Sequence, residues 1–117
     1  MRAIVTSSKD WPDESAVIDA LCELPTGAVV LLPTNSGACK FVRDNIEDLK
    51  LEIEDWAEDD AFYEKQGGSV NARMLQTEID ICFAFVGKDS YTAKDCVRRA
   101  RNMDLEVRVV EDQWQKS

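Results

Sequence analysis

The sequence predicts an α/β protein: a single Rossmann-like domain with a mainly parallel sheet of about five strands and helices on both faces. Two observations lead to this class. Short apolar runs alternate along the chain with segments whose apolar residues recur at helical spacing. The chain has 117 residues, of which 44% are hydrophobic, which suits one globular domain. Strands separated by helices pair in parallel through right-handed crossovers.

The expected elements follow one another in strict alternation. Apolar runs at 3–5, 28–32, 81–86 and 107–110 predict strands. All of these runs except 107–110 consist only of apolar residues. Alternating apolar and acidic residues at 51–53 predict a strand at or near an edge. We expect 28–32 and 81–86 inside the sheet, with 81–86 central. Helical spacing predicts helices that start near 12–13, 38, 70 and 93 and end near 24, 49, 78 and 103. We expect the domain to cover 1–111 and residues 112–117 to be a C-terminal tail.

The net negative charge and the lack of a long apolar segment limit the partners that this chain can bind. The formal net charge of −9 repels phosphate backbones, so we expect no nucleic-acid partner. No apolar run approaches the roughly 18 residues of a membrane helix, and the N-terminus lacks the features of a signal peptide. We therefore expect no membrane partner and a cytoplasmic location.

The cysteines and the absence of histidine exclude several chemistries. Cys22, Cys39, Cys82 and Cys96 are widely spaced, and the chain has no histidine. This pattern predicts no metal site and no cofactor, and four small buried thiols in a reducing compartment. Without histidine, Ser-His-Asp and Cys-His catalysis are excluded, so we assign no catalytic residue.

A ligand site is expected at the carboxyl ends of the strands, where open parallel sheets bind their ligands. Four polar turns fall there, at 7–10, 34–37, 67–71 and 87–92, and three of them lead into a helix N-terminus that favours an anion. Alternatively, these are ordinary turn and capping residues. The candidate ligand-binding residues are Ser8, Lys9, Asp10, Trp11, Asn35, Ser36, Gly37, Trp56, Gly68, Asn71, Gly87, Lys88, Ser90 and Thr92.

The stretch 47–64 is strongly acidic, with nine acidic residues against one lysine. It is either a solvated surface or a face that imitates nucleic-acid phosphates or docks a basic partner. Trp56, Phe62 and Tyr63 lie in the same stretch. They either stack on a base or anchor this segment on the core.

Several short motifs resemble the YspA-like, cpYpsA-related branch of the SLOG superfamily, the Rossmann-like group that includes the Lonely Guy proteins and DprA. Members of this branch are short and common in bacteria and phages, so the resemblance suggests a phage-encoded protein. The matching pieces cover nearly the whole chain. They are Asp10-Trp11, Asp55-Trp56, Gly68, Asn71-Ala72-Arg73-Met74-Leu75, Asp80-Ile81-Cys82-Phe83-Ala84-Phe85 and Asp95-Cys96-Val97-Arg98-Arg99-Ala100-Arg101.

The chain departs from that family where phosphate would bind. The family's Gly-Gly-Arg after the first strand is replaced by Ser7-Ser8-Lys9. Its Gly-Gly-Ala-x-Gly-Ala-Asp after the second strand is replaced by Pro33-Thr34-Asn35-Ser36-Gly37-Ala38-Cys39. The family's Gly-Thr before the last helix reads Thr92-Ala93. This chain therefore has fewer of the glycines that would let a phosphate approach the backbone closely. The resemblance therefore implies the fold and ligand binding more than catalysis.

Three functions follow as hypotheses. The first is a sensor or sponge that binds a nucleotide or a nucleotide-derived small molecule. The second is a non-catalytic interaction or inhibitor protein that engages a protein partner through its acidic or aromatic surface. The third is a phosphoribohydrolase-like enzyme that uses a carboxylate such as Asp10 or Asp89. SLOG proteins often self-associate, so the resemblance also implies a homodimer.

Overall fold

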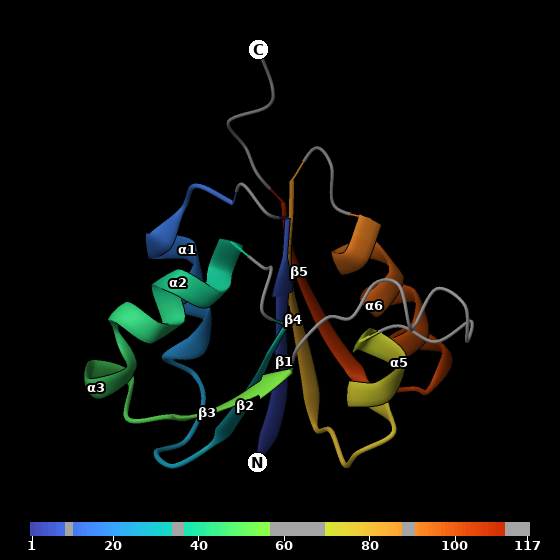
Figure 1. Cartoon of the computed structure of the whole chain (residues 1–117), viewed down its shortest axis with the longest axis horizontal. Coiled ribbons are helices and arrows are strands. Elements are labelled where there is room, and N and C mark those ends of the chain that lie inside the picture. The colour runs from blue at the N-terminus through green and yellow to red at the C-terminus, as the bar shows by residue number, and fades with distance from the viewer. Residues whose placement is uncertain (9–10, 34–36, 57–69, 88–90, 112–117) are drawn as a thin grey trace.

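The fold is a Rossmann-like α/β domain built on one five-stranded, all-parallel sheet, as the sequence predicts. A computed structural model describes residues 1–8, 11–33, 37–56, 70–87 and 91–111. The strand order is β3-β2-β1-β4-β5. Helices cover both faces of the sheet (Figure 1). The strands are β1 (Arg2–Ser7), β2 (Val29–Pro33), β3 (Glu52–Trp56), β4 (Ile81–Val86) and β5 (Glu106–Glu111).

Burial along the strands follows from their positions. The side chains of Ala3 to Ser7 in β1 are all buried, because β1 lies in the middle of the sheet with a helical layer on each side. β2 and β4 flank it and are almost as completely buried. β3 and β5 form the two edges, and their residues are exposed or half-buried. The expected positions of 28–32 and 81–86 inside the sheet and of 51–53 at an edge are confirmed, with β1 rather than β4 in the middle.

One face of the sheet carries α1 (Glu14–Leu21), α2 (Gly37–Asp44) and α3 (Ile46–Leu49) (Figure 1). The Asp13 carboxylate caps α1 by accepting a hydrogen bond from the amide of Ala16 at 3.1 Å. Val17, Leu21 and Val42 then pack against the sheet residues of this layer. Full burial of such side chains provides most of the favourable free energy of this layer, about 1.5–3 kcal/mol each.

The opposite face carries α5 (Val70–Leu75) and α6 (Tyr91–Asn102) (Figure 1). Met74 of α5 and Cys96 and Ala100 of α6 pack on Ile4 and Leu31, which point to this side of the sheet. The two hydrophobic clusters, one on each side, make the sheet the shared centre of the domain.

Several element boundaries differ from the sequence-based expectations. The helix expected from 38 to 49 divides at Asn45, whose side-chain amide donates to the Phe41 carbonyl at 2.8 Å and so takes the acceptor that a continuous helix would use. The helix expected to end at 78 ends at Leu75. The edge strand expected at 51–53 is longer than predicted, since β3 runs from Glu52 to Trp56.

No helix in the described part of the chain is long and apolar enough to cross a bilayer.

Candidate functional site

The strand order reverses between β1 and β4, which defines the topological switch point of this sheet. From β1 the chain adds β2 and β3 on one side, then returns to add β4 and β5 on the other. Ser8 and Gly87 follow β1 and β4 directly, and both are buried. The amide of Ser8 donates to the Phe85 carbonyl at 3.1 Å, which extends the β1–β4 ladder to the turn. In parallel α/β sheets, this is the position at which ligands bind.

The first amides of α2 are already engaged by β1. The amide of Gly37 donates to the Ser8 carbonyl at 3.0 Å, and the amide of Ala38 donates to the Ser7 Oγ at 2.8 Å. Ser7 Oγ in turn donates to the Ser8 carbonyl at 2.8 Å. The N–H groups at the start of this helix, where the sequence predicts an anion site, are therefore used inside the protein. An anion at this helix would have to displace these bonds, so α2 is a poorer anion site than the sequence suggests.

Trp11 is a core residue in this structure. Its side chain is only 3% exposed, and its ring packs against Phe85 with the ring centroids 5.5 Å apart. Its indole N–H donates to the Asp13 carbonyl at 3.0 Å, beside the start of α1. Trp11 joins α1 to the sheet, and a ligand cannot stack on its ring without displacing it from the core.

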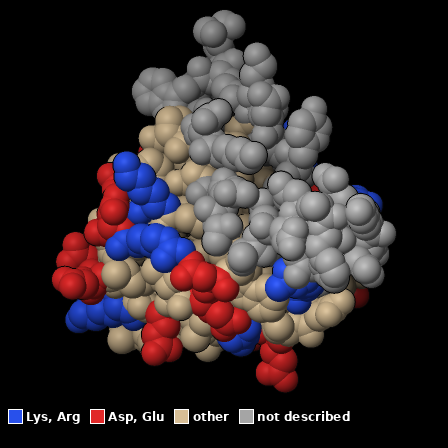
Figure 2. All heavy atoms as spheres, in the orientation of Figure 1, with Lys and Arg blue, Asp and Glu red and all other residues tan. Residues whose placement is uncertain are grey.

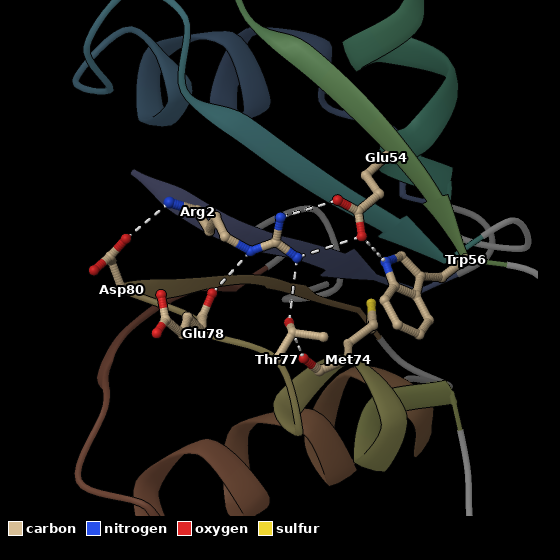
Figure 3. A network of polar contacts seen from close by, with 7 residues as sticks. All are labelled: Arg2, Glu54, Trp56, Met74, Thr77, Glu78 and Asp80. Atoms are coloured by element: carbon tan, nitrogen blue, oxygen red, sulfur yellow. Dashed lines mark hydrogen bonds and ion pairs between the residues drawn. The ribbon is translucent and has the colours of Figure 1, made fainter.

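Trp56 ends β3, at the carboxyl edge of the sheet, and belongs to a polar network (Figure 3). Its indole N–H donates to Glu54 Oε1 at 3.0 Å, and the guanidinium carbon of Arg73 lies 5.2 Å from its ring centroid. The cation–π contact covers part of the ring that a base would need for stacking. Arg73 also brings a positive charge to the carboxyl edge, and the sequence analysis did not assign it to the site.

Arg2 is the hub of this network (Figure 3). Its guanidinium binds both carboxylate oxygens of Glu54, at 3.0 and 3.3 Å, and also donates to the Glu78 carbonyl at 2.9 Å and to Thr77 Oγ1 at 3.3 Å. The backbone amide of Arg2 donates to the Asp80 carboxylate at 2.8 Å. These bonds tie the start of β1 to the edge strand β3 and to the α5–β4 connection. The hydrogen bonds from Arg2 hold the pKa of Glu54 below its usual range.

Thr6 is a site feature that the sequence analysis missed. Its hydroxyl is fully buried and has no hydrogen-bond partner among the described residues. Because side chains alternate along a strand, Thr6 points to the same side as Ile4, beneath α5 and α6. The residue lies in the last third of β1, next to the switch point. The sequence signal that would have identified it is a threonine that directly follows the apolar run 3–5 and so extends the buried strand.

Three of the four cysteines are buried, and one is exposed. Cys22 is exposed just after α1, so the expectation of four buried thiols is wrong for this residue. Cys39, Cys82 and Cys96 are buried. The sulfurs of Cys82 and Cys96 lie 3.6 Å apart, and the hydrogen bond between them and their burial raise the pKa of Cys96. Within the described residues, no group of three or more His, Cys, Asp or Glu side chains is placed to hold a metal ion.

The described acidic residues of 47–56 share their surface with cations. Lysine and arginine side chains are interspersed with aspartate and glutamate over the face that carries α2, α3 and β3 (Figure 2). Asp55 forms an ion pair with Arg43, and Glu54 with Arg2. This part of the surface therefore lacks the uninterrupted negative charge that a phosphate mimic needs.

The remaining candidate residues lie outside the described part of the chain. The side chains of Asn71 and Thr92 belong with them, although the backbone there is helical. The others are Lys9, Asp10, Asn35, Ser36, Phe62, Tyr63, Gly68, Lys88, Asp89 and Ser90.

No family model, curated protein or solved structure matches this chain.

Proposed function

We propose that this protein binds a nucleotide or a nucleotide-derived small molecule at the carboxyl edge of its sheet, between β1 and β4. The observation that carries this proposal is the reversal of strand order at β1 and β4, because open parallel sheets hold nucleotides outside that point. A role as a sensor or sponge for such a molecule needs binding and no chemistry. The resemblance to SLOG proteins points to the same class of ligand.

Three features of this edge support a phosphorylated ligand. The twelve-residue helix α6 begins just beyond the switch point, so its N-terminal amides and dipole favour an anion there. Arg73 adds a positive charge beside Trp56 at the end of β3. The orphan hydroxyl of Thr6 is a donor and acceptor for a ligand group or for a water that the ligand contacts. The net charge of −9 opposes an anion, but that field is screened over about 8 Å at physiological ionic strength.

Calorimetry against nucleotides, cyclic nucleotides and ADP-ribose-type molecules tests the proposal. Freshly purified protein should also release a small molecule on heating, detected by mass spectrometry. Asn71→Ala and Thr6→Val should each weaken binding by about 1 kcal/mol or more, the scale of one lost hydrogen bond. Thr77→Val is the control, because Thr77 precedes β4, at the opposite end of that strand from the switch point, and the change should leave affinity unchanged. If the wild type binds no member of the panel and releases nothing, the proposal fails.

A second candidate is a non-catalytic interaction protein whose ligand pocket has been lost. The hydrogen bonds of the Gly37 and Ala38 amides favour this second function, because amides bonded inside the protein do not donate to an anion at the start of α2. In that case no nucleotide binds, and affinity purification recovers a reproducible protein partner. Replacing surface residues near β3, such as Glu52→Lys, should then abolish the capture while leaving the fold intact.

A further inference from the structure

The edge strand β5 presents a free side of the sheet. Among the described residues it pairs only with β4, so the amide and carbonyl groups on its outer side have no strand to bind. Such an edge is a template for an added strand. Three of its six residues, Val107, Val109 and Val110, are β-branched and apolar, and Val109 is 38% exposed.

The two faces of β5 differ in chemistry. Arg108 points to the α1 side, where its guanidinium lies over the Phe83 ring and forms ion pairs with Glu23 and Glu106. Val107 points to the other side and packs in the cluster beneath α6. Val109 shares that face because side chains alternate along a strand. The exposed apolar part of the edge therefore lies on the α6 side.

A stripe of cations runs along α6 on the same side. Lys94, Arg98 and Arg101 are exposed and recur at i, i+4 and i+7, so they share one face of the helix. Arg99, Asn102 and Met103 line a shallow cavity of about 570 Å³ together with Leu75 and Gln76 of the α5 region, and so define the side of α6 that faces α5. On a helical wheel, Lys94 and Arg101 lie on the opposite side, toward β5. Among the described residues, neither of these two side chains forms an ion pair.

The charge of α6 points to the occupant of this surface, since Glu111, the one acidic residue of β5 on the α6 face, lies at the end of the strand. Residues 91–102 contain four cations, Lys94, Arg98, Arg99 and Arg101, and one acid, Asp95, in a chain whose net charge is −9. A second copy that paired β5 with β5 around a two-fold axis would bring two such stripes together on the same face, and their repulsion opposes that dimer. A nucleic acid would be repelled by the rest of the protein and makes no use of a strand edge.

We propose that β5 and the cation stripe of α6 form a docking surface for an acidic, extended peptide segment of a partner protein. The segment adds to the sheet as a sixth strand through main-chain hydrogen bonds to β5. Its acidic side chains on the α6 face meet Lys94 and Arg101, next to Arg98, which already pairs with Asp95. This surface is separate from the β1–β4 switch point, so the inference stands independently of nucleotide binding.

Fluorescence polarisation with a labelled peptide of alternating valine and glutamate tests this surface on the full chain. The peptide should bind, and its affinity should fall as salt rises, because screening weakens exposed charge pairs. Two control peptides separate the contributions. A peptide with lysine in place of glutamate lacks the charge complementarity, and a peptide with proline in place of alternate valines lacks amide donors for the added strand. Both control peptides should bind more weakly than the valine–glutamate peptide.

Matched protein variants localise the binding. Arg101→Glu should weaken the peptide's affinity at least about fivefold, the upper range of an exposed ion pair. Lys40→Glu makes the same change in charge on α2, across the sheet, and should have little effect. Hydrogen exchange of the complex should show new protection of β5 amides.

Three results would overturn the proposal: no binding of the acidic peptide at low salt, equal binding of the proline peptide, or equal loss in Arg101→Glu and Lys40→Glu. A single-stranded oligonucleotide that binds the stripe without protecting β5 would show a nucleic-acid surface instead. A concentration-dependent dimer that Val109→Lys dissolves would show that a second copy occupies the edge.

Discussion

Replacing Thr6 by valine should make the protein more stable, which is unusual for a change at a fully buried site. The Thr6 hydroxyl is buried without a hydrogen-bond partner among the described residues, so the folded state carries its desolvation penalty. Valine has nearly the same shape and suits a strand equally well. The substitution therefore removes a cost and leaves the packing beneath α5 and α6 almost unchanged.

The expected change in the free energy of unfolding follows from the cost of burying an unsatisfied polar group, and Thr77, whose hydroxyl has hydrogen-bond partners, serves as the comparison. Burying an unsatisfied polar group costs about 1–3 kcal/mol, so Thr6→Val should raise the free energy of unfolding by about 1 kcal/mol. Thr77 Oγ1 donates to the Met74 carbonyl at 2.7 Å and accepts from Arg2 at 3.3 Å. Because Thr77 is only half-buried, Thr77→Val should lower the free energy of unfolding by about 1 kcal/mol.

Urea denaturation of the wild type and both variants, without added ligand, measures these changes. The two variants should move the unfolding midpoint in opposite directions with unchanged m-values. In thermal melts, a change of 1 kcal/mol corresponds to about 4 °C for a domain of this size. If Thr6→Val is destabilising by about as much as Thr77→Val, the Thr6 hydroxyl is satisfied in solution and the reasoning is wrong.

Three further outcomes are expected. Arg2→Met should lower the free energy of unfolding by about 2 kcal/mol in urea titrations, because the Arg2 guanidinium makes four hydrogen bonds in a partly exposed site; a loss under about 0.5 kcal/mol would contradict this. Folding lowers the pKa of Glu54, so the Glu54 carboxylate contributes to the free energy of unfolding above the ordinary pKa of 4.5, and this contribution is lost as pH falls through the lower folded pKa. Glu54→Gln should therefore flatten the acid side of the stability–pH curve, and an unchanged curve would argue against the Arg2–Glu54 pair. Cys22 should react with a thiol reagent quickly and Cys96 only on unfolding, without an internal disulfide; one fast thiol per chain by mass spectrometry is the expected count, and several fast thiols would refute it.

The fold was predictable because its main signals are local. The buried runs at 28–32 and 81–86 are apolar on both faces, which suits strands beneath two helical layers. The break at Asn45 was missed because it depends on a side-chain amide competing for the Phe41 carbonyl, which a pattern of apolar spacing does not detect.

The candidate site was harder to predict because its chemistry depends on contacts between distant segments. Ser8 follows β1 and Gly37 begins α2, and the hydrogen bond between them joins segments far apart in the chain and removes a donor from the site. Trp11 carries the same aromatic signal whether it stacks on a ligand or packs on Phe85, and only the fold decides between them. Arg2 and Glu54 are far apart in the chain and meet because β1 and β3 belong to one sheet.

The Thr6 hydroxyl connects stability with function in a way that separates the two candidate functions. A buried polar group without a partner is a cost to folding, and such costs persist where a bound molecule or water repays them. If the switch point binds a nucleotide through Thr6, Thr6→Val gives a more stable protein that binds less tightly, so ligand-induced stabilisation shrinks while intrinsic stability rises. If the pocket has been lost, Thr6→Val gains the same stability and no member of the nucleotide panel stabilises either form. Measuring the melting temperature of both proteins with and without nucleotide therefore distinguishes a ligand site at β1 and β4 from a scaffold that acts through its surface.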